Sequence, residues 1–320
     1  MFNRVPRAFR VLSVSAATAA LLALSVPTAS SAPTVTTAAV SIKMGAATKD
    51  SASFDAFNAQ AGTFRSRRTF NSALPASFAK SLASSDVKAG RTSYWSFRPN
   101  PKTFPTDAAA QASFSAFLNT IPAGHQTVIM ALHEPEDEIR AGKFTLKQWG
   151  DTNNTVGRIV HSKNRPELRH GISLMGPWTF DSRSAYYQYN WKSVLDMSLL
   201  DVVGIDPYKF RTTDPSMQQM LTRSNSGNGT AGVASVMQVL ASWGKPIAIT
   251  EFGINAKDRY TGATISDTVR AQWITDAYAW MRSWNASNDV KIEAAMYFQL
   301  NPGGPYLTGA AVEALDATTV

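Results

Sequence analysis

Eight short apolar segments, separated by longer stretches, constrain the fold more than any other feature of the sequence. Apolar residues recur at helical spacing in several of the intervening stretches, at Ala108 to Asn119, Ala231 to Trp243 and Thr268 to Asn285. Alternation of this kind predicts βα units and a parallel sheet. We expect strands at Ile42–Ala47, Phe64–Phe70, Thr92–Phe97, Thr127–His133, Gly171–Trp178, Val202–Tyr208, Ile247–Phe252 and Ile292–Gln299.

A closed barrel accounts for this pattern better than an open sheet. Eight strands spread over about 280 residues match the size and repeat of a (β/α)8 barrel. An open doubly wound sheet that binds a dinucleotide would carry a G-x-G-x-x-G fingerprint, and the sequence has none. We therefore predict an α/β protein with a single (β/α)8 TIM barrel over residues 42–320. In such barrels the reactive groups collect at the C-terminal ends of the strands.

The first residues have the pattern of a secretory signal peptide. Three arginines precede an apolar run from Val11 to Val26, and small residues follow as far as Ala32. The run is short for a bilayer span, so we expect no membrane anchor. We predict a signal peptide over residues 1–32 and a flexible leader, rich in Ala, Ser and Thr, over residues 33–41. The mature chain is then expected to be a secreted, extracellular monomer.

Composition removes several classes of function. The chain contains no cysteine, which excludes disulfides, a thiolate nucleophile and sulfur-ligated metals. Its formal net charge is +8, part of which comes from the leader. Such an excess could favour an anionic envelope polymer, but the basic residues are scattered, as on an ordinary solvated surface. Without a basic stripe interleaved with aromatic residues, we expect no nucleic-acid partner.

Two glutamates stand directly after apolar strand patterns. Glu134 follows the run Thr127–Leu132, and Glu251 ends the run that begins at Pro246. A lone glutamate in such a place is more often a loop or cap residue. These two, however, fall at the expected ends of strands four and seven, which lie across the barrel mouth from each other. Retaining cleavage of a glycosidic bond needs two carboxyl groups about 5 to 5.5 Å apart, one protonated and one ionised.

The motifs around these glutamates resemble those of clan A glycoside hydrolases. The segments His133–Pro135, Gly204–Tyr208 and Thr250–Gly253 carry the resemblance, and the His-Glu pair makes the chain most similar to glycoside hydrolase family 26. The resemblance is specific at the expected strands four, six and seven. Departures from family 26 at Pro135–Glu138 and Tyr297–Gln299 leave β-mannan as one of several substrates that fit.

The resemblance implies roles for four residues. Glu134 would be the general acid/base and Glu251 the nucleophile. Tyr208 matches a tyrosine that hydrogen-bonds the nucleophile, and His133 would lie under the acid/base and tune it. The implied activity is that of a retaining, endo-acting hydrolase on a β-linked polysaccharide, with no cofactor.

Further candidates lie at expected strand ends. Trp95, Trp178 and Phe298 could stack on sugar rings, although aromatic residues there are at least as often part of the core. Arg98 could bind hydroxyl or carboxylate groups or form a structural ion pair. The remaining substrate-binding candidates are Asp206, whose alternative is a hydrogen bond holding the Pro207 turn, and Gln299 at the end of strand eight.

Other residues receive less specific interpretations. Glu136, Asp137 and Glu138 are expected in a solvated loop, with Glu136 close enough to be a rival acid. Trp273, Trp280 and Trp284 share a helical face and are expected to pack in the core.

Other catalytic classes find little support. The four histidines form no H-E-x-x-H pair and no G-x-S-x-G elbow occurs, so we expect neither a metal nor a serine triad. A transglycosylase acting on an envelope polysaccharide and a non-catalytic carbohydrate-binding barrel remain the alternatives.

Overall fold

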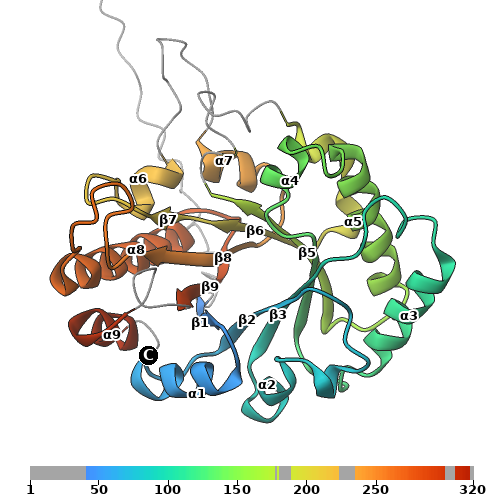
Figure 1. Cartoon of the computed structure of the whole chain (residues 1–320), viewed down its shortest axis with the longest axis horizontal. Helices are drawn as coiled ribbons and strands as arrows, with labels where there is room; N and C mark the ends of the chain where they lie inside the picture. The colour runs from blue at the N-terminus through green and yellow to red at the C-terminus, as the bar shows by residue number, and fades with distance from the viewer. Residues whose placement is uncertain (1–40, 177–178, 180–188, 223–234, 300–306, 318–320) are drawn as a thin grey trace, which may run out of the picture. The chain divides into compact units, whose positions relative to one another are not determined.

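The computed structural model describes residues 41–176, 179, 189–222, 235–299 and 307–317. All of these residues belong to one compact unit of the chain. Figure 1 shows strands gathered at the centre of this unit and helices around them. The predicted signal peptide, and all but the last residue of the predicted leader, lie outside the described residues.

The described strands form a closed parallel barrel. Neighbouring strands pair in chain order from β1 to β6, then β6 pairs with β8, β8 with β9, and β9 with β1, which closes the ring. The short β7 pairs only with β8, at the C-terminal end of the barrel. The predicted (β/α)8 TIM barrel is thus confirmed, with β8 and β9 as its seventh and eighth strands. The bounds are β1 Lys43–Thr48, β2 Ser66–Asn71, β3 Thr92–Phe97, β4 Thr127–Ala131, β5 Leu168–Met175, β6 Val202–Asp206, β7 Tyr208–Lys209, β8 Ile247–Ile254 and β9 Ile292–Gln299.

The helices cover the outside of the barrel (Figure 1). Several begin at a polar cap: Asp107 accepts a hydrogen bond from the Ala110 amide at 2.9 Å, and Thr145 forms a capping box with Gln148. The described helices are α1 Ser51–Gln60, α2 Ser84–Ala89, α3 Ala108–Asn119, α4 Glu136–Arg140, α5 Leu146–His161, α6 Met217–Thr222, α7 Val236–Ala241, α8 Asp267–Ser287 and α9 Gly309–Asp316.

Both faces of the strands are buried, as expected for a parallel sheet. All six residues of β3 and all eight of β8 are buried. One set of side chains faces the helices, and a second set, which includes Tyr94, Met130 and Met296, forms a separate cluster inside the barrel. Because side chains fill the interior, a polymer could approach the strands only at the ends of the barrel.

The strand bounds agree best with expectation where the apolar run is sharply limited, as at β3 and β9. The expected strand Val202–Tyr208 is interrupted after Asp206, and Tyr208 belongs to β7 instead. Trp273 and Trp280 are buried in the core as expected, with Trp284 packed against the same cluster. Within the described residues, no helix combines the length and hydropathy needed to cross a membrane.

Candidate active site

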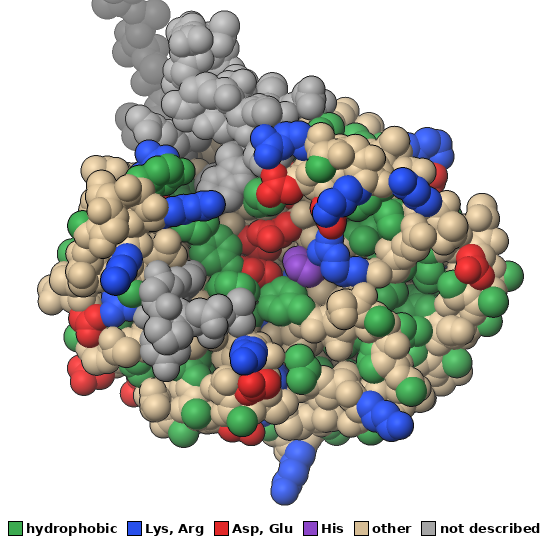
Figure 2. Space-filling view, in the orientation of Figure 1, with side chains coloured by type: hydrophobic (Ala, Val, Ile, Leu, Met, Phe, Trp, Pro, Cys, Tyr) green, Lys and Arg blue, Asp and Glu red, His purple; other side chains and the backbone are tan. Residues whose placement is uncertain are grey.

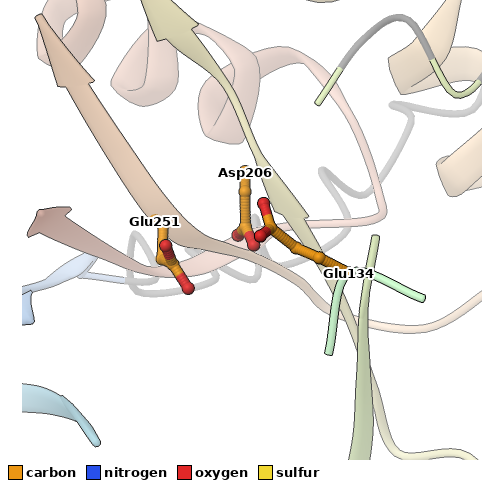
Figure 3. A group of neighbouring side chains, drawn as sticks. All are labelled: Glu134, Asp206 and Glu251. Atoms are coloured by element: carbon orange, nitrogen blue, oxygen red, sulfur yellow. The ribbon is translucent and has the colours of Figure 1, made fainter. Parts of the chain in front are cut away.

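Three carboxylates meet at the C-terminal mouth of the barrel. Glu134 lies just beyond β4, Asp206 ends β6, and Glu251 lies on β8. One oxygen from each carboxylate lies within 4.8 Å of the other two. Figure 3 shows the three side chains converging from separate elements, and Figure 2 shows acidic side chains in the hollow at the centre of this face. The structure therefore brings together the two predicted glutamates and Asp206, which was a predicted substrate-binding residue.

The backbone that presents Glu134 is held in an unusual conformation. Leu132 and Glu134 both have positive φ angles, 51° and 47°, which typically cost about 1–3 kcal/mol each. Three hydrogen bonds hold the segment: Leu132 donates to Phe97 O at 3.0 Å, Glu134 donates to Ser173 O at 3.0 Å, and Leu132 O accepts from Trp149 Nε1 at 3.2 Å. This segment is thereby fixed to β3, β5 and α5. No described side chain donates a hydrogen bond to the Glu134 carboxyl group.

Glu251 has a different environment. It is 3% exposed, and Tyr208 Oη donates a hydrogen bond to its Oε2 at 2.6 Å. Arg68 Nε lies 3.7 Å from its other oxygen. The hydrogen bond from Tyr208 is the contact that the resemblance implies. Both neighbours favour the ionised form of Glu251, whereas Glu134 has no comparable described partner.

Arg68 is a site residue that the sequence analysis did not predict. It is fully buried on β2, donates to Ser96 Oγ at 2.5 Å, and lies over the Phe70 ring at 4.8 Å. A detectable signal was present, because β2 carries two consecutive arginines in a strand that should be apolar on both faces. A charged side chain inside such a strand indicates a buried anionic partner.

Asp206 is a buried acid of the mouth and does not hold the rim turn at Pro207. It is fully buried, accepts a hydrogen bond from Ser173 Oγ at 2.9 Å, and also accepts one from Thr250 Oγ1. These hydroxyls come from the strands on either side of it. Asp206 therefore holds a negative charge next to the two glutamates.

The three acids differ in proton affinity. Burial raises the pKa of each, and the charges of Glu251 and Asp206 raise the pKa of Glu134 further. Arg68 and the Tyr208 hydroxyl oppose this rise at Glu251. The pKa of Glu134 is the highest of the three, so a single proton shared by this cluster resides on Glu134.

His133 lies beside the cluster and is uncharged at neutral pH. Burial, followed by the charges of Arg68 and Arg98, lowers the pKa of His133 well below its usual value. The ring packs against Phe70 at 5.1 Å between centroids, and its Nδ1 has no described hydrogen-bond partner. Its predicted tuning of Glu134 would therefore act through position and polarity, not through charge.

Glu136, Asp137 and Glu138 were expected in a solvated loop, but they form the first turn of helix α4. Glu136 is fully buried, not solvated, and accepts hydrogen bonds from the Met175 amide at 2.7 Å and Thr179 Oγ1 at 2.8 Å. Burial raises its pKa to about 8. Asp137 is exposed as expected, and Glu138 is half-buried and paired with Arg98. Glu136 thus ties the loop of Glu134 to the end of β5.

The aromatic candidates separate into two groups. Trp95 was wrongly placed in the site: it is fully buried and stacks on Phe117 of α3, with ring centroids 4.6 Å apart. Phe298 does line the mouth, with its ring 5.7 Å from that of Tyr208. The third candidate, Trp178, lies outside the described residues.

Two polar candidates make structural contacts. Arg98 pairs with Glu138 and donates to the carbonyl oxygen of His133 at 3.4 Å. Gln299 is buried, and its amide bonds both backbone groups of Leu307. In the described residues these side chains stabilise loops around the mouth.

The same three carboxylates could also hold a metal ion, because their oxygens converge closely enough. The Arg68 guanidinium already supplies positive charge 3.7 Å from Glu251. With Tyr208 donating to the same glutamate, we interpret the group as an acid–base site.

Comparisons with known proteins reveal similarity in fold but none in sequence. No family model matches the chain, and neither does any curated protein. Among solved structures, a GH128 endo-β-1,3-glucanase from Amycolatopsis mediterranei, crystallised with laminaripentaose, has a TM-score of 0.53 at 13% identity, covering 86% of this chain and 99% of that one. A GH26 β-mannanase from Bacteroides ovatus has a TM-score of 0.52 at 13% identity, covering 88% of each chain.

A third solved structure shares the barrel fold. A Clostridium thermocellum xylanase with CBM22 and GH10 modules also matches, with a TM-score of 0.55 at 11% identity, covering 87% of this chain and 66% of that one. Family 26 is thus one of several families with this fold, and membership in it stays a prediction.

Proposed function

We propose that this protein is a retaining glycoside hydrolase that cleaves a β-linked polysaccharide, with Glu134 as general acid/base and Glu251 as nucleophile. The observation that carries the proposal is that two carboxyl groups with oxygens within 4.8 Å of each other have different hydrogen-bond and charge environments. Glu251 receives a hydrogen bond from Tyr208 and faces Arg68, whereas Glu134 receives no hydrogen bond from a described side chain. Such a pair provides one ionised and one protonated carboxyl group.

The reaction proceeds in two displacements. The Glu251 carboxylate attacks the anomeric carbon while the bond to the leaving sugar breaks and Glu134 transfers its proton to the leaving oxygen. Glu134, now ionised, then takes a proton from water, whose oxygen attacks the same carbon and releases Glu251. Arg68 and Tyr208 hold the nucleophile in place and keep it ionised before attack.

The carboxylate separation supports retention of configuration. Retaining enzymes place the two groups about 5–5.5 Å apart, whereas inverting enzymes leave about 6.5–9.5 Å for a water molecule. One oxygen of Glu134 lies within 4.8 Å of one oxygen of Glu251, which supports the shorter class. Proton NMR of the first product should therefore show the β-anomer, and initial formation of the α-anomer would exclude Glu251 as a nucleophile.

The similar structures and the N-terminal sequence support proposals for the substrate class, the mode of cleavage and the location. The similar solved structures include an endo-β-1,3-glucanase and a β-mannanase, which supports an internal cut in a β-linked chain. The arginine-led apolar leader supports secretion to the extracellular space. A sugar hydroxyl could replace water in the second displacement, which would make the protein a transglycosylase.

The decisive experiment measures reducing-sugar release from β-1,3-glucan, mannan, xylan and mixed-linkage glucan. We expect wild type to release sugar from at least one polymer, and Glu134→Gln and Glu251→Gln to lose this activity while remaining folded. Asp137→Asn changes an exposed acid of helix α4, close in sequence to Glu134, and is the matched control that should retain the activity. Binding without release by the wild type would instead identify a carbohydrate-binding barrel.

A further inference from the structure

Two loops beside the mouth present a group of basic and aromatic side chains that the proposed reaction does not use. Arg211 lies in the loop after β7, and Arg259 and Tyr260 lie in the loop after β8. All three are exposed, with Tyr260 at 67%. We call Arg211, Arg259 and Tyr260 the basic rim. Figure 2 shows basic side chains on the side of the face where β7 lies in Figure 1.

The basic rim connects to the catalytic cluster through stacked rings. Tyr208, which donates to Glu251, stacks on Phe210 with centroids 5.5 Å apart and an interplanar angle of 17°. The Arg259 guanidinium lies 5.4 Å from the centroid of the same Phe210 ring. A polymer that occupies the mouth and extends over β7 would therefore meet the rim within a short distance of the cleaved bond.

Hydrogen bonds join the two loops into one platform. The Asp258 carboxylate is 4% exposed and accepts from the Thr212 amide at 2.9 Å and from the Tyr260 and Thr261 amides at 3.0 Å each. The Arg259 amide donates to Phe210 O at 2.9 Å. A platform held in this way presents its side chains with little loss of conformational freedom on binding.

The acids of these loops direct their hydrogen bonds to backbone amides, although the charges of Asp214 and Asp258 attract Arg211. Asp258 bonds backbone amides, as above, and Asp214 accepts from the amides of Phe210 and Arg211 at 2.8 Å each. Neither Arg211 nor Arg259 forms an ion pair with a described carboxylate. Instead, Arg211 stacks on Tyr260 at 3.9 Å from the ring centroid. A hydrogen bond with the Tyr260 side chain raises the pKa of Arg211 and engages part of its N–H edge. A guanidinium has five N–H donors, so the remaining ones can still bond to an anion.

We infer that the basic rim binds acidic groups carried by the polysaccharide, so that the protein binds an anionic glycan more tightly than a neutral one. Tyr260 offers a flat apolar face to a sugar ring, and Arg211 and Arg259 bind carboxylate groups on that or neighbouring sugars. The inference rests on the proposed function, because it assumes that a polysaccharide occupies the mouth.

A matched arrangement elsewhere in the chain provides the control. Arg282 stacks on Tyr278 at 4.9 Å on the outer helix α8, and Arg65 is exposed in the loop before β2, at the opposite end of the barrel. The double variants R211Q/R259Q and R65Q/R282Q lose the same charge. Only the first removes it from beside the mouth.

Affinity electrophoresis tests the inference independently of catalysis. The Glu251→Gln protein is run at low salt in gels containing a soluble β-glucan, its carboxymethylated form, or DNA. We expect tighter binding to the carboxymethylated polymer, and R211Q/R259Q in this background should raise that dissociation constant about tenfold. R65Q/R282Q should change this dissociation constant less than twofold, which corresponds to about 0.4 kcal/mol or less in binding free energy.

Three outcomes would overturn the inference: equal binding to the neutral and carboxymethylated glucans, equal effects of the two double variants, or DNA binding as tight as glucan binding. The first two leave the hydrolase proposal intact if neutral polymers are still cleaved. If no polymer is cleaved but binding depends on Arg211 and Arg259, the hydrolase proposal is wrong, whereas binding of acidic groups by the basic rim is supported.

Discussion

The two ends of the barrel interior each hold a cluster of buried or half-buried ionisable side chains, and the clusters differ in how completely they are paired. At the N-terminal end, Arg169 forms two hydrogen bonds to Glu293, at 2.7 and 2.9 Å, and Tyr94 adds a third at 2.6 Å. At the mouth, three carboxylates share one guanidinium. Arg68 Nη2 and Glu251 Oε1 have no hydrogen-bond partner among the described residues.

This difference suits the paired cluster to stabilising the fold and the incompletely paired cluster to proton transfer. A buried charge with all its partners resists a change in protonation and holds strands together. A cluster with too many acids for its cations keeps a proton mobile, at a cost in stability, as catalytic groups require. The protein thus has fully paired ionisable groups at the N-terminal end of the barrel and incompletely paired ones at the mouth, where we propose that substrate binds.

The largest expected effect comes from exchanging a glutamate for glutamine at each end. Glu251→Gln should lower kcat by more than about thousandfold, because an amide is a poor nucleophile. The melting temperature should hold or rise, since a buried charge in a crowded acid cluster is removed. Glu293→Gln should preserve kcat but lower the free energy of unfolding by about 2–4 kcal/mol, because it leaves Arg169 short of its partner.

Steady-state kinetics and urea denaturation check both halves of this prediction. If Glu293→Gln lost activity while remaining as stable as wild type, the two ends would not differ in the proposed way.

A smaller effect is expected from the two tyrosines that donate to these glutamates. Tyr208→Phe removes a hydrogen bond to an ionised group, typically worth about 1.5–3 kcal/mol, so kcat should fall about 10- to 100-fold. The pKa of Glu251 should rise, because the hydroxyl no longer stabilises its charge. Since Glu251 must be ionised to attack, the acidic limb of the pH–rate profile should move to higher pH.

Tyr94→Phe is the matched control for Tyr208→Phe, because it removes an equivalent bond at the other end. It should lower the melting temperature and leave the pH–rate profile unchanged. An unchanged profile in Tyr208→Phe would show that the tyrosine does not set the charge of Glu251.

The sequence predicted the barrel and its two central acids because both leave local signals. Apolar runs limited by polar residues gave β3 and β9 their bounds, and Glu134 and Glu251 each interrupt such a run. The prediction that Trp95 lies in the site was wrong because no local signal marks the direction of its side chain. A strand buried on both faces is apolar throughout, so its sequence does not reveal which residues point inward.

Glu136 and Arg68 depended on partners that are distant in sequence. Three consecutive acidic residues normally indicate a solvent-exposed segment. Glu136 is nevertheless buried, and it accepts hydrogen bonds from the Met175 amide and the Thr179 hydroxyl. Arg68 is explained by Glu251, which only the closure of the barrel brings near. Interactions of this kind cannot be read from local pattern.

Glu136, a buried acid near the mouth, should make the stability of the protein depend on pH. Burial raises its pKa to about 8, above the usual value for glutamate. The native state therefore binds an extra proton between about pH 4.5 and 8, and wild-type stability should fall as pH rises through this window. Glu136→Gln removes this dependence, so its stability relative to wild type should be greater at pH 8 than at pH 5, by at least about 1 kcal/mol.

Thermal denaturation at the two pH values measures this difference, with Asp137→Asn as an exposed control that should show none. An equal effect of Glu136→Gln at both pH values would mean that Glu136 is ionised throughout the range.

The smallest effect is expected at the rim, where an aspartate is satisfied by backbone amides and not by a cation. Hydrogen bonds from the amides of Thr261, Thr212 and Tyr260 hold the pKa of the Asp258 carboxyl well below its usual range. Asp258→Asn replaces one accepting oxygen by an amide nitrogen, which cannot accept, so the contact between the two loops should loosen.

Because the catalytic cluster does not depend on this contact, Asp258→Asn should cleave neutral polymer at the wild-type rate. Its dissociation constant for carboxymethylated glucan should rise by only about two- to fivefold, since both arginines remain but are less well positioned. Asp196→Asn, which removes a similar carboxylate cap from a turn outside the barrel, is the control. Equal losses in the two variants would show that the rim gains nothing from its rigid support, and binding there would then depend on charge alone.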